Sequence, residues 1–188
     1  NRDLVAKWDF NSAAPTLDSR GNFGELTLSG TAKLTEEGLE LNSGGYARAA
    51  DYKGPVIGEK TLIAFLVLND LDDLRPAGSA LTLDAINQDS FDGLVLGERR
   101  DREWMAGSNH WSRTEDLSSP AAVEEEAGDL IMIAATYEKT GNNTTRVTMY
   151  RNGVYLGQYE KGNLATWPGG NTEALFGCRH LVGDSAHG

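Results

Sequence analysis

The chain has 188 residues, a net charge of −11, 22 glycines and one cysteine. Its length suits a single domain over residues 1–188 with a two-layer core, and its glycine content favours short strands joined by turns over long helices. The acidic charge argues against nucleic-acid binding, which needs clustered lysine and arginine, and no apolar run is long enough to insert into a membrane. The lone Cys178 cannot form an internal disulfide, and we expect it to be a small buried core residue.

Short apolar or alternating runs predict strands in the first half of the chain, separated by loops rich in glycine, proline and asparagine. These runs cover residues 4–10, 25–29, 33–35, 38–41, 46–49 and 61–68. The last of them, TLIAFLVL, is the most apolar run and is bounded by turn residues. It therefore predicts a central strand.

The second half continues the same pattern, with predicted strands at residues 79–86, 93–97, 103–106, 110–113, 130–138 and 173–179. We expect 103–106 and 110–113 to pair with each other around the sequence Gly107-Ser108-Asn109. The run AAVEEEA at 121–127 has helix propensity but is too short for an amphipathic helix, so a loop is predicted there.

The clearest local signal is a hairpin in RVTMYRNGVYLGQY, centred on Asn152-Gly153. Asn-Gly favours a type I′ turn, because that turn needs positive φ at both central residues. A two-residue turn places Tyr150 opposite Tyr155 and Met149 opposite Leu156. The turn also fixes the register, since a slip by one residue would exchange the two faces of the hairpin.

Roughly a dozen short strands and no convincing long helix predict an all-β sandwich or barrel. Six segments carry a more specific resemblance: LVAKWDFN at 4–11, LDSRGNFGELTLSG at 17–30, GLELNSGGYARAAD at 38–51, TLIAFLVLND at 61–70, LIMIAATYEKTGNNTTRVTMYRNGVYLG at 130–157 and FGCRH at 176–180. Together they resemble the laminin-G-like modules of bacterial proteins, in the concanavalin A-like lectin/glucanase superfamily. The block at 130–157 is the most specific of the six.

This resemblance implies a jelly-roll-like sandwich of two antiparallel sheets. It also implies an exported module, extracellular or periplasmic, joined to other domains of a larger parent protein. Such modules normally end in a further strand, and its pattern does not occur before Gly188. We therefore expect this closing C-terminal strand to be missing and one sheet edge to be exposed to pairing.

A polar, turn-rich stretch supplies the candidate ligand-binding residues: Arg99, Arg102, Trp104, His110, Trp111 and Arg113. Sugars offer apolar ring faces and many hydroxyls, so a sugar site combines flat aromatic rings with forked polar groups. We expect a non-catalytic recognition module that binds a glycan or a protein partner. The alternative for the two tryptophans is that they cover the edges of the core.

Calcium is a further expectation from the resemblance, because related modules hold the ion through aspartates and loop carbonyls. Asp9, Asp18 and Asn22 lie in or beside the first loop, in the matching region. Calcium needs six to eight oxygen ligands. A capped turn without a metal is the alternative at this position.

Catalysis is not expected, although the superfamily includes glycoside hydrolases that use two carboxylates. The predicted central strands carry only Glu138, at an end, while Glu98, Asp101 and Glu103 lie beside arginines in a predicted loop and are expected to form a solvated charged segment. A glycoside hydrolase remains the alternative, supported if two carboxylates face each other across a sheet. A purely structural spacer is a third possibility.

Overall fold

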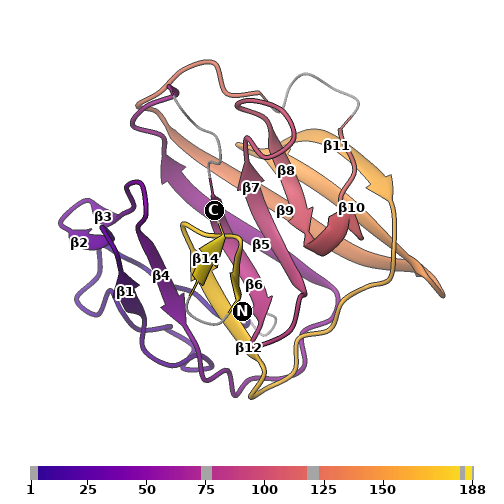
Figure 1. The fold of residues 1–188 in the computed structure, drawn as a ribbon, viewed down its shortest axis with the longest axis horizontal. Coiled ribbons are helices and arrows are strands. Elements are labelled where there is room, and N and C mark those ends of the chain that lie inside the picture. Colours follow the sequence, from indigo (N-terminus) through magenta and orange to yellow (C-terminus); the bar gives the residue numbers. More distant parts are fainter. Residues whose placement is uncertain (1–3, 73–77, 118–122, 183–184, 188) are drawn as a thin grey trace.

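The computed structural model describes residues 4–72, 78–117, 123–182 and 185–187, and in these ranges the chain is almost entirely β (Figure 1). One sheet has six antiparallel strands in the order β1 (Thr27–Ser29), β4 (Tyr46–Ala49), β12 (Thr172–Phe176), β6 (Ser79–Ala85), β7 (Phe91–Leu96) and β8 (Trp104–Ser108). The other has four antiparallel strands in the order β11 (Val154–Glu160), β10 (Thr144–Arg151), β9 (Leu130–Gly141) and β5 (Lys60–Val67). Two small hairpins complete the described strands, β2 (Lys33–Thr35) with β3 (Gly38–Glu40) and β13 (His180–Val182) with β14 (Ser185–His187).

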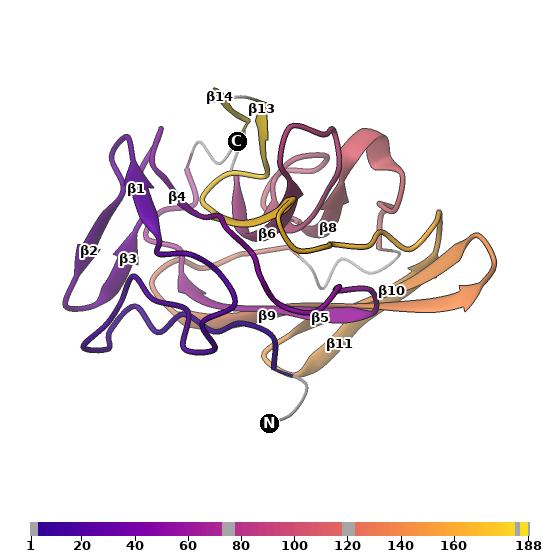
Figure 2. The same cartoon turned by 90° about the horizontal axis from the view of Figure 1, so that it is seen from below.

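The two larger sheets pack face to face, as Figure 2 shows, which confirms the expected sandwich of antiparallel sheets. A single cluster of buried apolar side chains fills the space between them. Leu94 on β7, with Ile133 on β9 and Val147 on β10, is fully buried there. The alternation of side chains along each strand directs these residues inward, and burial of their apolar surface holds the layers together.

The Asn152-Gly153 hairpin forms as predicted, with φ values of 51° and 79° at the two turn residues. Tyr150 lies opposite Tyr155, also as predicted. The next pair differs, because an irregularity after Met149 places Gly157, not Leu156, opposite it. A β-bulge adds one residue to one strand of a pair, and a turn-based register does not reveal it.

Two predicted strands are absent from the described chain. Residues 4–10 form no strand because loop residues take their hydrogen bonds: Lys7 N–H donates to Asp18 Oδ1 at 2.9 Å, and Ser19 N–H donates to the Lys7 carbonyl at 2.8 Å. Residues 110–113 do not return as a strand, since a short 3-10 helix, η1 (Asn109–Trp111), follows β8. The predicted loop at 121–127 lies partly outside the described residues, and within them Val123 forms an isolated bridge with Glu103.

A charged cluster lies inside the sandwich and links the sheets. Lys60 Nζ on β5 lies 2.7 Å from Asp92 Oδ2 on β7, and Arg113 Nε lies 2.7 Å from Asp92 Oδ1. All three side chains are buried. Burial lowers the pKa of Lys60, and the neighbouring Asp92 carboxylate opposes that shift.

Candidate functional site

The segment after β8 presents two bulky side chains in an uncommon backbone conformation. His110 and Trp111 have φ values of 49° and 56°, in the left-handed region that such residues rarely adopt. Each left-handed residue of this kind costs on the order of 1–3 kcal/mol and persists only where the surroundings hold it. The Trp111 side chain is 38% exposed. We call residues 109–112 the Trp111 loop.

Buried hydrogen bonds hold both ends of the Trp111 loop. Ser108 Oγ lies 2.8 Å from Thr114 Oγ1 and accepts the Arg113 backbone N–H at 2.8 Å. The Arg113 side chain is bound to Asp92 and also donates to Asn109 Oδ1 at 3.2 Å. These contacts fix the loop before any ligand arrives, and such preorganisation lowers the entropy lost on binding.

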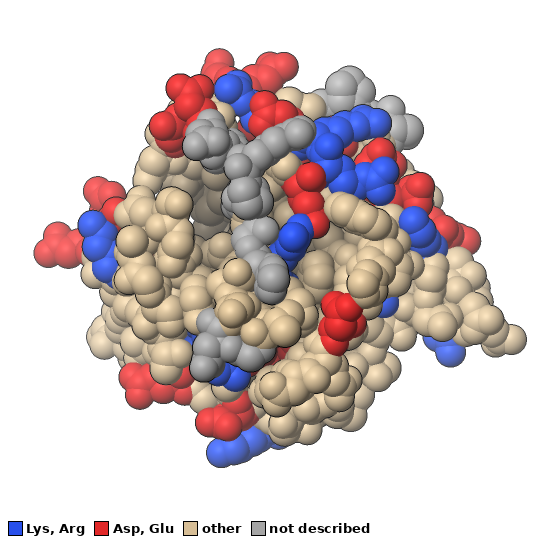
Figure 3. Space-filling model, viewed as in Figure 1, with Lys and Arg blue, Asp and Glu red and all other residues tan. Residues whose placement is uncertain are grey.

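Arg99 lies over the exposed indole, and Arg99 and Arg100 both bind Asp116. The Arg99 guanidinium lies 5.1 Å from the centre of the Trp111 ring, within the range of a cation–π contact. Arg99 Nε also lies 2.8 Å from Asp116 Oδ1, and Arg100 Nη2 lies 3.4 Å from Asp116 Oδ2. Basic and acidic side chains are interspersed over the upper part of the face drawn in Figure 3. Around Trp111 itself, Arg99 offers hydrogen-bond donors and its partner Asp116 offers acceptors.

Arg102 points to another set of acids. Its Nη2 lies 3.6 Å from Asp72 Oδ1 and its Nε lies 3.8 Å from Asp101 Oδ2. The Arg102 backbone carbonyl accepts the Glu124 N–H at 2.7 Å. Arg102 thus contacts Asp72, Asp101 and Glu124, which lie outside the Trp111 loop.

Two of the expected ligand-binding residues, Trp104 and Arg113, are buried, so neither presents its side chain to a ligand at the surface. Trp104 is only 1% exposed, and its indole N–H donates to Glu124 Oε1 at 2.7 Å. Arg151 holds the same Glu124 carboxylate through two bonds of 2.9 Å. Trp104 is thus a core residue with no free ring face, and Arg113 positions the Trp111 loop from below.

A chain of acids and histidines continues from the Trp111 loop across the outer side of the six-stranded sheet. His110 Nε2 lies 2.5 Å from Asp89 Oδ2, and His180 Nε2 lies 3.8 Å from Asp89 Oδ1. His180 Nδ1 lies 2.6 Å from Asp84 Oδ1, and its ring stacks on Phe91. Sequence reasoning missed Asp84 and Asp89. The available signal was Asp84 itself, a lone acid in the apolar run at 79–86.

Asp84 on β6 lies directly opposite Glu173 on β12, so two carboxylates share one face of the sheet. Both are buried, and Glu173 Oε2 lies 2.5 Å from Arg48 Nε. Burial raises the pKa of Asp84 to about 7, against the hydrogen bond from His180. Neither residue belongs to the expected solvated charged segment.

That segment is less solvated than expected: Glu103 is buried, and Glu98 pairs with Arg179.

The residues expected to bind calcium lie in a turn that is closed by hydrogen bonds. The Asp18 carboxylate accepts backbone N–H groups from Lys7, Arg20, Asn22 and Phe23 at 2.8–3.3 Å. The Asn22 amide donates to the Val5 carbonyl at 2.7 Å, and Asp9 lies 3.8 Å from the Lys7 ammonium. No three histidine, cysteine or acidic side chains of the described ranges form a group that could hold a metal ion.

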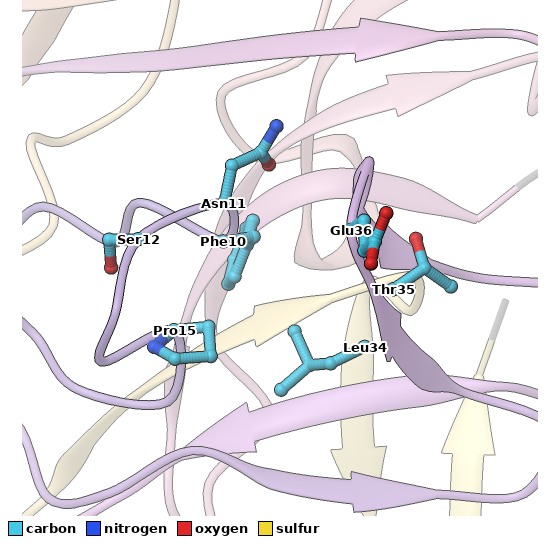
Figure 4. Close-up of a pocket in the computed structure, with 7 residues that line it drawn as sticks. All are labelled: Phe10, Asn11, Ser12, Pro15, Leu34, Thr35 and Glu36. Atoms are coloured by element: carbon cyan, nitrogen blue, oxygen red, sulfur yellow. The ribbon is translucent and has the colours of Figure 1, made fainter.

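An open hollow of about 580 Å³ lies between the first loop and the β2–β3 hairpin (Figure 4). Its lining consists of Phe10, Asn11, Ser12, Pro15, Leu34, Thr35 and Glu36. Glu36 is its one charged lining residue, and none of the residues expected to bind a ligand contributes to it. The Trp111 loop is therefore the better candidate, because it joins an exposed aromatic ring to several polar groups.

No protein-family model matches the chain, and no curated protein matches it in sequence. Among the described residues there is also no helix with the length and apolar character needed to cross a membrane.

Proposed function

We propose that this protein is a non-catalytic recognition module and that its Trp111 loop binds a carbohydrate. The observation that carries the proposal is the presentation of Trp111: an exposed indole in a left-handed backbone conformation, held from below by the buried Arg113. Backbone strain of this kind gathers at binding sites, where the surrounding structure maintains it. A rigid aromatic ring binds a ligand with little loss of side-chain entropy.

The groups around the ring suit a polyhydroxylated ligand. A sugar hydroxyl both donates and accepts hydrogen bonds, so it needs donors and acceptors close together. Arg99 and His110 provide nitrogen groups, and their partners Asp116 and Asp89 provide carboxylate oxygens. The exposed part of Trp111 offers an apolar surface for a sugar ring.

The test is a glycan array followed by isothermal titration calorimetry on the best ligand. We expect Trp111→Ala to bind at least tenfold more weakly, a loss of about 1.4 kcal/mol. Leu28→Ala is the matched control, because Leu28 is 37% exposed and lies on β1, at the opposite edge of the same sheet. Both variants should keep the wild-type circular dichroism spectrum. Unchanged affinity in a folded Trp111→Ala protein would remove the site.

The proposal extends to the wider identity of the chain. The sandwich of antiparallel sheets and the six segments described above support a laminin-G-like module of the concanavalin A-like superfamily, with a jelly-roll arrangement. Such a module works outside the cytoplasm, extracellularly or in the periplasm, beside other domains. A protein partner at the Trp111 loop is the variant of this proposal that applies if no glycan binds.

A glycoside hydrolase is the second candidate, favoured by the opposed carboxylates of Asp84 and Glu173. A raised pKa near 7 suits Asp84 to act as a general acid, and Glu173 on the neighbouring strand pairs with the Arg48 guanidinium. We rank this candidate second because both side chains are buried and bonded, so a substrate in solution does not reach them.

A reducing-sugar assay over a panel of polysaccharides separates the two candidates. A hydrolase should release sugar ends, and Asp84→Asn and Glu173→Gln should each abolish the release. A recognition module should bind without any release. Absence of both binding and hydrolysis would leave the structural spacer.

A further inference from the structure

The outer face of the four-stranded sheet carries an exposed apolar surface. Its strands alternate between core-facing and outward-facing residues, and the pairing aligns the outward ones in rows. In one row Ile63 on β5 lies opposite Ala134 on β9, which lies opposite Tyr150 on β10, which in turn lies opposite Tyr155 on β11. Neighbouring rows continue this apolar surface.

In those rows Phe65 lies opposite Met132, and Val67 lies opposite Leu130. We call six residues of this surface the outer apolar face: Ile63, Phe65, Val67, Leu130, Tyr150 and Tyr155. Phe65 is 71% exposed.

This surface is unusual for its lack of charge in a chain of net charge −11. None of its six residues is an aspartate, glutamate, lysine, arginine or histidine, and acids gather beyond its ends instead. Asp70 and Asp129 flank one end, and Glu138, Arg146 and Glu160 form ion pairs at the other. A contiguous apolar surface with a polar rim is typical of a protein interaction site.

We propose that a second copy of this chain packs on the outer apolar face, so that two four-stranded sheets stack face to face in a homodimer. Two acidic molecules repel each other, and the repulsion is smallest where neither surface carries a charge. A two-fold axis through the face brings each apolar row against the same row of the other copy, because an isologous contact uses one patch twice. Sheets stacked in this way lie about 10 Å apart.

The size of the face fits a weak dimer. Four strands about 4.8 Å apart, over about seven residues at about 3.4 Å each, give a flat area of about 450 Å² per copy. Two copies together bury about 900 Å², before the relief of the side chains is counted, which is below the range of stable interfaces and in the range of weak, transient ones. We therefore expect a dissociation constant in the micromolar range or weaker.

Sedimentation velocity and light scattering over about 10 µM to 1 mM test the proposal. The monomer has a mass of 20.3 kDa, and we expect the wild-type mass to rise toward twice that value with concentration. Phe65→Glu should stay monomeric over the same range, because it places a charge in the contact. Val182→Glu is the matched control: Val182 is 57% exposed on β13, which lies beyond the six-stranded sheet on the other side of the molecule (Figure 2), and this variant should dimerise like the wild type.

Three results would overturn the proposal. The wild type would remain at 20.3 kDa at every concentration. Alternatively, Phe65→Glu and Val182→Glu would weaken association equally, which places the contact elsewhere. In the third case the wild type would be monomeric but would float with vesicles of neutral lipid, and Phe65→Glu would not, which assigns the face to a membrane surface. Ile63→Lys repeats the test if Phe65→Glu fails to give the wild-type circular dichroism spectrum.

Discussion

Trp104 and Trp111 stand close together in the chain but lie in opposite environments. Both occur in a polar stretch with turn residues, so their sequence surroundings do not distinguish them. The difference comes from partners elsewhere in the chain. The Trp104 indole N–H donates to Glu124, which Arg151 also binds, whereas Arg113 donates to Asn109 in the Trp111 loop. Burial of a single side chain is decided by such long-range contacts.

We expect Trp104→Ala to lower the free energy of unfolding by about 3–5 kcal/mol, the usual loss when a large aromatic side chain is removed from a core. The substitution also deprives the buried Glu124 of a hydrogen bond. Urea denaturation followed by circular dichroism measures the change. Trp111→Ala provides the comparison and should change stability by less than about 1 kcal/mol, since surface substitutions have small effects. Similar losses in the two variants would contradict this assignment of core and surface.

Asp84 should make the folded chain less stable as the pH rises, whereas an acid in a surface ion pair makes it more stable. Its pKa is raised from 3.8 to about 7, mainly by burial, so between these values the folded chain holds a proton that the unfolded chain has released. The contribution of Asp84 to the free energy of unfolding therefore falls as the pH rises from about 4 to about 7. Asp84→Asn should remove this contribution, which thermal melts at several pH values will show as a flatter curve.

The control for this pH dependence is Asp9→Asn, because the Asp9 side chain is half exposed and lies 3.8 Å from Lys7. Its curve should run parallel to that of the wild type over the same range. A curve for Asp84→Asn that keeps the wild-type slope would show that Asp84 does not retain its proton in the fold.

At the scale of elements, the Trp111 loop depends on a glycine in the connection after β11. A Cβ at Gly162 would lie only 2.1 Å from the Ser112 carbonyl oxygen, and the φ of 63° at Gly162 also favours glycine. The connection therefore packs directly against the backbone of the Trp111 loop. The loop geometry is set by two segments about fifty residues apart in sequence.

We expect Gly162→Ala to lower stability by more than Gly153→Ala and to weaken ligand binding at the Trp111 loop. Gly153 also has a positive φ, of 79°, but no atom lies within 4 Å of its would-be Cβ, so alanine there costs only about 1–2 kcal/mol of backbone strain. Chemical denaturation and calorimetry on both variants measure the two effects. Equal losses of stability, with intact binding in both, would exclude the close packing at Gly162.

Local patterns were enough to predict several elements. The strands at 33–35 and 46–49 have the predicted limits, and the Asn152-Gly153 turn has the predicted positive φ values. The strand expected at 4–10 does not form. Alternating side chains predict which way each residue would face, but they do not provide a neighbouring strand for the backbone to pair with. The bulge opposite Met149 and the acids Asp84 and Asp89 depend on neighbours distant in sequence, which a local pattern does not contain.

Across the whole molecule, the two sheets are joined by charge as well as by apolar packing. The cluster of Lys60, Asp92 and Arg113 contains two bases and one acid, so removal of the acid is the most damaging change. Tyr137 lies beneath Lys60, with its ring centre 4.1 Å from the ammonium nitrogen. The Lys60 ammonium is therefore shielded from water, so it depends on Asp92 for its counter-charge.

We expect Asp92→Ala to lower the free energy of unfolding by about 3–5 kcal/mol, because it leaves two buried cations without a counter-charge. Lys60→Met should cost clearly less, since Asp92 and Arg113 remain as a balanced pair. Urea denaturation of the two variants gives the comparison. A larger loss in Lys60→Met than in Asp92→Ala would show that Lys60, not Asp92, is the main stabiliser of the cluster.

The single cysteine has a practical consequence for spectroscopy. Cys178 is buried with Leu175 and Leu181 on the outer side of the six-stranded sheet, and burial raises the pKa of its thiol to about 12, with Asp84 and Glu173 adding to the shift. A thiol in that state is scarcely ionised at neutral pH and reacts slowly with maleimides. A cysteine introduced at Val182, which is exposed and lies outside the outer apolar face, would therefore carry a spin label or fluorophore at one defined position, and distances between two such labels would report directly on how copies of the chain associate.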